Sequence, residues 1–247
     1  MIRPALTSLL LLLVLNGAAA AQTPAAKTSR FGIEDNSFLV EEALNQERGI
    51  FQNIFVASRS RDGAWTGSFT QEWPLGGQRN QFSYTIPYSR VDGAGDVGDV
   101  FINYRLQVWD GGDSRPAFSP RLSWSTSAWQ VNLPFSKEAD RFYFHLNAGN
   151  TWIRHGADGA ATPFVAGSAI LAVKPMLNLM LEVYNEWRPS ANDRDRMTIV
   201  SPGVRGGWNL GEAQLILGLA APITRGAARD HAVLGYLSYE LPFSKNR

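Results

Sequence analysis

The chain contains three histidines, His145, His155 and His231, and these are its only imidazole bases. Nucleophilic hydrolysis needs a nucleophile, a base and a group that orients the base, all within hydrogen-bond reach. His145 falls on the polar side of an alternating stretch, Asn147 follows two positions later, and Ser123 or Ser125 could lie on another strand. A single histidine among polar residues is usually a hydrogen-bonded structural group, so we expect no catalytic residues and no enzyme.

Metal and cofactor chemistry is also poorly represented. The chain has no cysteine, which excludes thiolate ligands and disulfides. Asp92, Asp96 and Asp99 could place carboxylates on one loop, but their spacing does not match a calcium-binding loop. The glycines of the same stretch indicate a turn, because the lysine and the following helix of a phosphate-binding loop are missing. We therefore expect no metal and no cofactor.

The charged side chains that could contact a solute are spread over many alternating stretches, and in each stretch they lie on the polar side. Lysine is scarce there, and arginine occurs together with carboxylates. Both signs of charge in one narrow space would suit a lumen that is filled by paired side chains. The candidates for lining such a lumen are Glu72, Asp99, Arg105, Arg121, His145, Glu182, Glu186, Arg205 and Glu240.

The elements that must position these residues are β-strands. In the stretch 81–89, Phe82, Tyr84 and Ile86 alternate with polar residues, and this period recurs from about residue 49 onward. No long stretch of that region keeps helical spacing. Such runs predict about twelve strands. They lie near 50–58, 64–73, 79–90, 97–109, 116–126, 128–135, 141–154, 162–174, 176–188, 195–208, 212–222 and 231–243.

The even strand number and the connections indicate a single antiparallel transmembrane barrel. If the N-terminus is periplasmic, the odd connections should be outside and longer, and the even ones inside and shorter. The even ones are tight, most odd ones are longer, and the fifth connection, around 125–128, is the short exception. Aromatic residues at many strand ends suit the two girdles that such a barrel places at the membrane interfaces.

Residues 1–21 have the features of a cleaved signal peptide. Arg3 supplies the positive start, residues 9–15 an apolar core, and residues 19–21 a small-residue cleavage site. Removing Arg3 leaves 23 − 1 = 22 basic residues against 22 acidic ones, so the mature chain has no net charge. Balanced charge gives no reason to expect a nucleic-acid partner. No later apolar run reaches the roughly 18 residues of a membrane helix, so membrane residence would require a barrel.

The segment 22–48 differs from the strands that follow. Its second half is acidic, and Ser37 four positions before a glutamate resembles the start of a helix, with Phe38 and Ala43 on one helical side. Two interpretations are open. The segment is a plug in or under the lumen, or it is a periplasmic lead-in that is helical or irregular.

Several motifs together resemble a family of Gram-negative outer-membrane β-barrels that are labelled as transporters, similar to the MetA-pathway-of-phenol-degradation family. They include QFSYTIPY at 81–88, GDVFINYRLQ at 98–107, SPGVR at 201–205 and LSYELPF at 237–243. The resemblance implies an outer-membrane location and transport, with aromatic compounds as solutes by the family label alone. It carries over no functional residue.

The last strand also resembles the signal that the barrel-assembly machinery reads, which normally ends in an aromatic residue. Tyr239, Leu241 and Phe243 would be its residues. Four residues follow Phe243, which places the signal slightly inside the chain.

These observations predict an all-β organisation with a signal peptide at 1–21, a lead-in or plug at 22–48, one outer-membrane barrel at 49–243 and a tail at 244–247. We expect a passive channel or transporter for small solutes. Its partners would be outer-membrane lipid, the assembly machinery during insertion, and a small-molecule solute. The alternatives are a closed structural barrel without transport activity and a secreted soluble β-sandwich.

Overall fold

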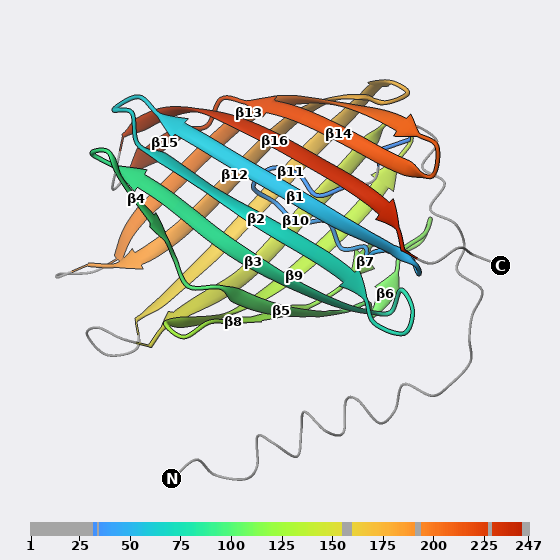
Figure 1. The fold of residues 1–247 in the computed structure, drawn as a ribbon, viewed down its shortest axis with the longest axis horizontal. Coiled ribbons are helices and arrows are strands. Elements are labelled where there is room, and N and C mark those ends of the chain that lie inside the picture. Colours follow the sequence, from blue (N-terminus) through green and yellow to red (C-terminus); the bar gives the residue numbers. More distant parts are fainter. Residues whose placement is uncertain (1–31, 34, 155–159, 191–193, 227–228, 244–247) are drawn as a thin grey trace, which may run out of the picture.

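The computed structural model describes residues 32–33, 35–154, 160–190, 194–226 and 229–243, and their strands form one closed antiparallel barrel (Figure 1). The predicted signal peptide and the tail at 244–247 lie outside these residues. Twelve strands make the barrel. They are β1 (Ile50–Ser60), β2 (Trp65–Pro74), β3 (Asn80–Val91), β5 (Phe101–Leu106), β8 (Arg121–Trp124), β9 (Ala128–Ala139), β10 (Phe142–Ile153), β11 (Ala161–Lys174), β12 (Leu177–Pro189), β13 (Arg194–Leu210), β14 (Ala213–Ala220) and β16 (Asp230–Pro242).

Short strands extend the barrel wall at its rims. β4 (Ala94–Val97) pairs with β3, and β15 (Ile223–Gly226) pairs with β13 and β16. β6 (Trp109–Asp110) pairs with β7 (Ala117–Phe118), which in turn pairs with β9.

The predicted all-β barrel and its strand number are confirmed. The largest differences in strand bounds concern the predicted strands at 97–109 and 116–126, which are interrupted. Pro116 and Pro120 carry no backbone N–H group, so the ladder beside them cannot be continuous. Isolated bonds take its place, such as Leu106 N–H to the Pro120 carbonyl at 3.1 Å.

The barrel closes between its first and last strands. β1 pairs with β16 from Ile50 opposite Pro242 to Ser60 opposite Ala232, and the β9–β10 pair completes the ring. Because β1 starts where β16 ends, both lie at one rim, which we call the terminal end; the other rim is the far end (Figure 1). A closed ring leaves no unpaired strand edge, which a bilayer would not tolerate.

The two faces of the wall have opposite chemistry. On β12, the side chains of Leu179 and Leu181 are 50% and 49% exposed, whereas Asn178 and Glu182 on either side of this pair point inward and are fully buried. Leu219 and Leu146 are likewise 60% and 50% exposed on the outer face. A soluble sandwich would bury these leucines in its core, so that alternative is wrong. An apolar outer face and a polar interior are what a membrane barrel requires.

Aromatic residues mark both rims on the outer face. At the terminal end, Trp73 stacks on Phe51 with ring centroids 4.7 Å apart, and Phe243 packs on Trp73 at 5.2 Å. At the far end, Trp129 and Trp152 stack at 3.8 Å. The predicted girdles are therefore present at both rims, where a bilayer would have its polar interfaces.

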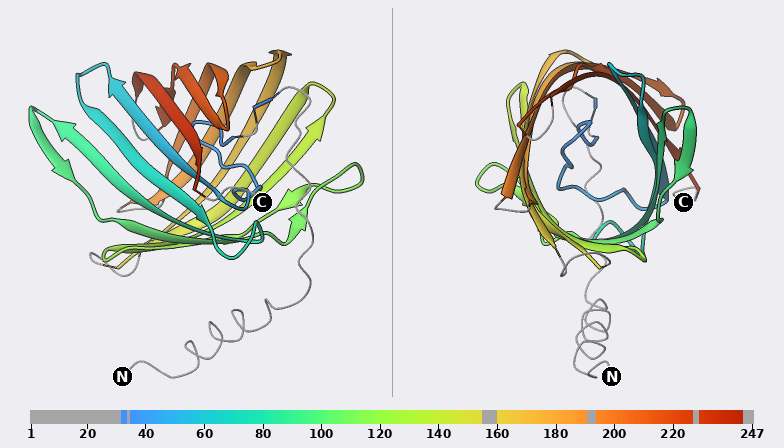
Figure 2. Two further views of the ribbon diagram at one scale, coloured as in Figure 1. Left: turned by 45° about the vertical axis from the view of Figure 1, so that its right-hand side comes forward. Right: turned by 90° about the vertical axis from the view of Figure 1, so that its left-hand side faces the viewer.

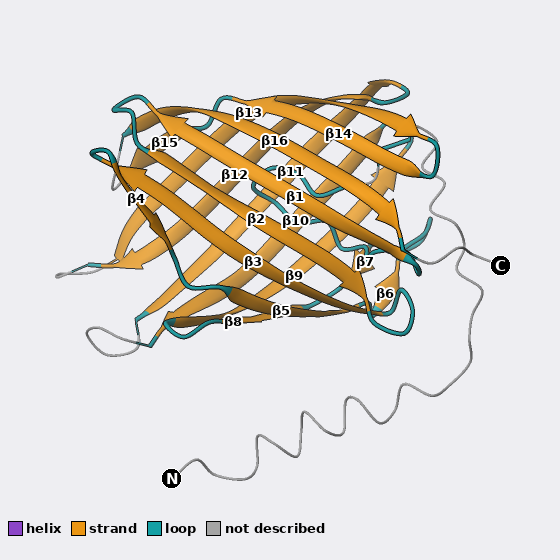
Figure 3. Ribbon diagram, viewed as in Figure 1, coloured by secondary structure: helices purple, strands orange, loops and turns teal. Residues whose placement is uncertain are grey.

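The segment that precedes β1 is irregular, and the structure contains no helix within the described residues (Figure 3). Of the two predicted alternatives for this segment, the irregular one is observed for residues 35–48, and the helical one is wrong. None of the described residues forms a helix that is long and apolar enough to cross a membrane. The segment enters the barrel and folds back inside it (Figure 2).

A lysine on the outer face tests the membrane orientation. Leu146→Lys places a charge near the middle of β10, where lipid would surround it, and we expect the free energy of unfolding to fall by about 2–4 kcal/mol. Leu210→Lys is the matched control, because Leu210 is also exposed (61%) but ends β13 at the rim. There the cost should be about 0–1 kcal/mol. Urea unfolding of both variants in phospholipid vesicles measures the difference, and equal costs would contradict the orientation.

Candidate functional site

Residues 32–33 and 35–48, which we call the inner segment, lie in the lumen of the barrel (Figure 2). Ile33, Val40, Ala43 and Asn45 are each at most 1% exposed. The segment starts at the terminal end, where the Gln214 side chain donates to the Gly32 carbonyl at 3.0 Å. It returns to the same end because β1 begins there. The inner segment is thus a loop that enters and leaves through one rim.

The wall provides acceptors for the backbone N–H groups of the inner segment. Glu182 Oε1 accepts from Leu39 N at 2.7 Å and from Val40 N at 3.2 Å. Asn147 Oδ1 accepts from Glu41 N at 2.9 Å. Further along, the acceptors are Ser136 Oγ for Ala43, Gln107 Oε1 for Asn45 and Gln81 Oε1 for Gln46. These bonds come from strands β3, β9, β10 and β12 and from the chain after β5, so the segment is held from several sides.

The wall also provides donors for the backbone carbonyls. Arg205 Nη1 donates to the carbonyls of Asp35 and Asn36 at 3.0 and 2.7 Å. Arg105 donates to those of Glu42 and Leu44 at 3.0 and 2.9 Å. The Asn147 and Gln107 amides complete the set with the carbonyls of Glu41 and Ala43. A helix would use these same N–H and C=O groups internally, which explains why the inner segment is irregular.

Side chains of the inner segment add charged contacts. Glu41 forms an ion pair with Arg121 and lies 4.0 Å from Arg105. The Asp35 carboxylate accepts from the Tyr236 hydroxyl and from the Gln52 amide, each at 2.8 Å. Burial raises the pKa of Asp35 above its ordinary value, the Arg205 guanidinium opposes this effect, and the Glu42 carboxylate adds to it.

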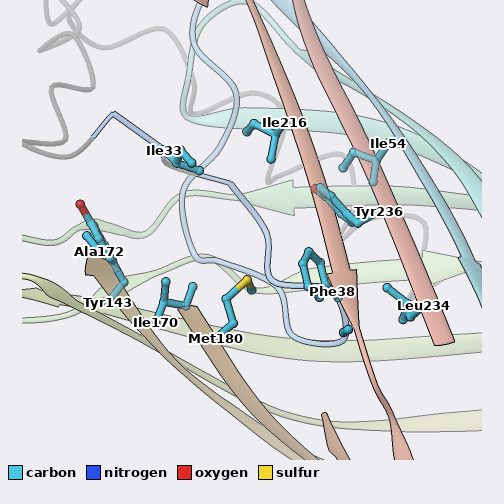
Figure 4. Close-up of a cluster of buried hydrophobic side chains, with 11 residues drawn as sticks. Ile33, Phe38, Ile54, Tyr143, Ile170, Ala172, Met180, Ile216, Leu234 and Tyr236 are labelled. Atoms are coloured by element: carbon cyan, nitrogen blue, oxygen red, sulfur yellow. The ribbon is translucent and has the colours of Figure 1, made fainter. Parts of the chain in front are cut away.

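Phe38 is the apolar anchor of the inner segment. Its ring packs against Tyr236 with centroids 5.1 Å apart, in a cluster with Ile33, Met180 and Leu234 (Figure 4). Gly218 of β14 leaves the space for the ring, because a Cβ at that position would lie 2.4 Å from Phe38 atoms. One side of the lumen is therefore apolar and shaped around this ring, whereas the other side binds the backbone.

The predicted lumen residues divide into two groups. Glu72, Arg105, Arg121, His145, Glu182 and Arg205 all face the lumen near the inner segment. Glu72 and Arg105 approach to 3.7 Å, but most of the arginine bonds go to carbonyls of the segment and not to wall carboxylates. The prediction of charges that pair across the lumen therefore describes only part of the arrangement.

The remaining predicted residues, Glu186, Glu240 and Asp99, differ in position. Glu186 is an inward residue that forms an ion pair with Arg188. Glu240 is half-buried and opposite Gln52 in the β1–β16 register, and Asp99 is exposed before β5.

Two of the predicted assembly-signal residues, Tyr239 and Leu241, lie on the outer face of β16, and Phe243 directly follows this strand. Tyr239 stacks on Phe55 with centroids 6.5 Å apart, Leu241 is opposite Phe51, and Phe243 is 50% exposed at the terminal end.

The neutral side chains that bind the segment were missed as site residues by sequence reasoning. They include Gln52, Gln81, Gln107, Ser136, Asn147 and Tyr236. Most of them fall on the polar side of the alternating stretches, so position was a usable signal. Their neutral side chains gave no reason to prefer them over charged neighbours.

Of the three histidines, the structure describes His145 and His231. Ser136 Oγ lies 2.7 Å from His145 Nδ1, but the same oxygen also accepts from Ala43 N, so it serves the inner segment. His231 is exposed at the start of β16, and His155 lies outside the described residues. Within the described part of the chain, no group of three His, Asp or Glu residues could hold a metal ion.

No family model and no curated protein matches the sequence. An outer membrane channel from Pseudomonas putida is 11% identical, with 81% of this chain and 98% of that chain covered and a TM-score of 0.57. The translocator domain of autotransporter NalP from Neisseria meningitidis is 8% identical, with 79% and 87% covered and a TM-score of 0.45. Outer membrane protein Omp33 from Acinetobacter baumannii is 10% identical, with 82% and 100% covered and a TM-score of 0.41.

The channel from Pseudomonas putida supports the fold assignment, since its TM-score of 0.57 extends over most of both chains. The chain has the fold of bacterial outer-membrane β-barrels, as predicted, and this fold implies the outer membrane as its location. The resemblance to the MetA-pathway-of-phenol-degradation family stays a prediction.

Removing one wall acceptor tests how the inner segment is held. Glu182→Ala leaves the Leu39 and Val40 amides without their carboxylate, and bonds to a charged group contribute about 1.5–3 kcal/mol. We expect hydrogen exchange at residues 38–41 to accelerate by about one to two orders of magnitude. Glu186→Ala is the control, because Glu186 bonds Tyr184 and Arg188. Hydrogen-exchange mass spectrometry measures both variants, and unchanged exchange in Glu182→Ala would contradict the assignment.

Proposed function

We propose that the protein is a passive channel of the outer membrane for small polar solutes, and that the inner segment restricts passage through it. The observation that carries the proposal is the way in which the lumen is filled. The wall does not fill it with its own inward side chains alone. A separate segment occupies it, held by hydrogen bonds and one aromatic anchor, and such a segment can leave without breaking the strand ladder.

The part of the lumen between the inner segment and the far end is lined by polar side chains. This lining supports the proposal that the solute is polar. Thr70 and Thr85 hydroxyls bond across β2 and β3 at 2.9 Å, and Asn103 donates to Thr85 at 3.3 Å. Gln130 donates to Thr151 across β9 and β10 at 2.9 Å. A wall of hydroxyl and amide groups offers solutes replacements for their hydration, which is how pores select by hydrogen bonding and size.

His145 is the single histidine at the site among the described residues, and a single histidine among polar residues is usually structural. This agrees with a channel role and not with an enzymatic one. The competing proposal is a closed structural barrel, which the deep burial of Val40 and Ala43 favours. The two proposals differ in whether the inner segment can move. The two proposals can be distinguished by measuring the conductance of the full-length barrel with the inner segment fixed in place and again with it free to move.

A reversible cross-link provides this lock. Ser37 Oγ and Ser168 Oγ lie 2.7 Å apart, and the chain has no cysteine, so Ser37→Cys with Ser168→Cys gives one defined disulfide. We expect single-channel openings in planar bilayers to vanish when the pair is oxidised and to return with reductant. Ser37→Cys alone is the control, and its single-channel openings should be the same under oxidising and reducing conditions.

Two outcomes would contradict the channel proposal. A folded barrel that stays silent in the reduced state, and also after deletion of residues 33–45, would be a structural barrel. Openings that persist in the oxidised protein would show that the inner segment does not control the path.

We also propose that the last strand presents the barrel to the assembly machinery through Tyr239, Leu241 and Phe243. Phe243 is 50% exposed although it packs on Phe51 and Trp73, so part of its ring remains available.

An alanine substitution tests this assembly role. Phe243→Ala should lower the yield of heat-modifiable, folded barrel in cells severalfold. Trp208→Ala is the control, because Trp208 is also exposed (51%) near the terminal end but lies on β13. Equal yields of the two variants would contradict a specific signal.

A further inference from the structure

Glu41 of the inner segment and Arg121 of β8 form an ion pair that solvent can reach from inside the barrel. Their side chains are 23% and 20% exposed, and Arg121 points inward, since its neighbour Leu122 is 43% exposed on the outer face. Arg121 also donates to Gln130 at 2.7 Å, and Gln130 belongs to the polar lining toward the far end. A solute that enters that part of the lumen therefore meets this ion pair.

Three buried polar atoms at and beside Arg121 have no hydrogen-bond partner among the described residues. They are Nε of Arg121 itself, Oγ of Ser123 on the same face of β8, and Oδ1 of Asn132, which is opposite Arg121 in the β8–β9 register. Ser123 and Asn132 are each only 2% exposed. Because buried polar atoms are normally paired, unpaired ones indicate a place for a ligand or water. The guanidinium Nε and the hydroxyl can both donate to an anion.

The charges around this site form two pairs. Arg105 lies 3.7 Å from Glu72 of the wall, and Arg121 pairs with Glu41 of the inner segment. The second oxygen of Glu41 lies 4.0 Å from Arg105 and accepts no hydrogen bond. If the Glu41 side chain moved away, Arg121 would have no carboxylate within ion-pair distance in the described part of the chain. A partly buried guanidinium without its carboxylate favours a new one in the same place.

The Glu41 side chain can move without the rest of the inner segment. Its backbone is held separately, because Asn147 accepts from its N–H group and donates to its carbonyl, each at 2.9 Å. Rotation about the side-chain bonds would therefore release the carboxylate and leave the backbone in place. Beyond Cα, the glutamate side chain has the atoms of propionate. The ion pair thus already shows how a small carboxylate fits against Arg121.

We propose that Arg121 is the binding site for the carboxylate group of a small organic anion, and that Glu41 occupies this site when no solute is present. The solute carboxylate takes the place of Glu41 on the guanidinium, and the Ser123 hydroxyl donates to it. Asn132 Oδ1 accepts from a hydroxyl group of the solute or from water. The site deepens the proposed channel function, on which it rests for the route of the solute, because it names organic anions as the solute class. Binding requires only rotation of Glu41, so the two proposals can fail separately.

Isothermal titration of the full-length barrel in detergent micelles tests the site with two probes of nearly the same shape. Propionate replaces chloride at constant ionic strength, so that general screening stays the same. Propionamide is its uncharged counterpart. The Glu41→Ala barrel should bind propionate at least about tenfold more tightly than the wild type does, because the internal competitor is gone. It should also prefer propionate to propionamide by at least about tenfold.

Three further variants locate the binding. Glu41→Gln keeps the shape of the side chain and should also bind propionate more tightly than the wild type, so it reports on the site even if Glu41→Ala disturbs folding. Adding Arg121→Gln to Glu41→Ala removes both members of the ion pair and should weaken propionate binding at least about tenfold. Glu212→Ala is the control, because Glu212 is an exposed carboxylate at the turn between β13 and β14. It changes the net charge equally and should leave the wild-type affinity for propionate.

Equal affinity for propionate and propionamide in both Glu41 variants would overturn the inference. Propionate binding that ignores both substitutions of Glu41, or that survives Arg121→Gln, would overturn it as well. A barrel that conducts without binding propionate would overturn this site and leave the channel proposal intact. A barrel that binds propionate at Arg121 but never conducts would contradict the channel and support the site.

Discussion

Every backbone polar group inside the lumen must find a hydrogen-bond partner, and the rest of the structure depends on how this requirement is met. Strand backbones meet it through the closed ladder, which has no free edge. The inner segment has no ladder, so it depends on wall side chains, with Glu182 and Asn147 as acceptors and Arg105 and Arg205 as donors. Leaving a buried peptide group unpaired costs more than the net gain from a typical bond, so these side chains fix the path of the segment.

The wall can supply these partners because of the alternation along each strand. A period of two places every second side chain in the lumen and leaves the others to face lipid. The outer face must be apolar, and this frees the inner face to be polar without exposing charge to hydrocarbon. The aromatic anchor is an exception to this alternation, because it is an apolar side chain inside the lumen. Phe38 sits where small residues such as Gly203 and Gly218 thin the inner face, so an apolar ring is buried inside an otherwise polar lumen.

Alternation also explains why most of the fold could be predicted from the sequence. It is a local pattern, and neither strand number nor closure requires knowledge of distant contacts once the period is established. The helical alternative for residues 35–48 was wrong for the opposite reason. Ser37 and the residues after it carry local helix signals, but wall side chains more than a hundred positions away, such as Glu182 and Ser168, take the groups that a helix would use. Arg105 and Arg205 were predicted to face the lumen. Their main partners could not be predicted, because these are backbone carbonyls and every residue type has one.

The same bonds constrain how a channel of this kind would open. If the inner segment left, Arg105, Arg205 and Glu182 would lose the partners that offset their burial, and a buried unpaired charge is strongly unfavourable. Water must therefore enter as the segment leaves, because it is the only replacement that can reach these groups. Opening and hydration of the lumen would then be one event, since each wall charge that releases a peptide group becomes a charge that lines an aqueous path. Side chains that hold the closed state would in this way become those that meet the solute in the open state.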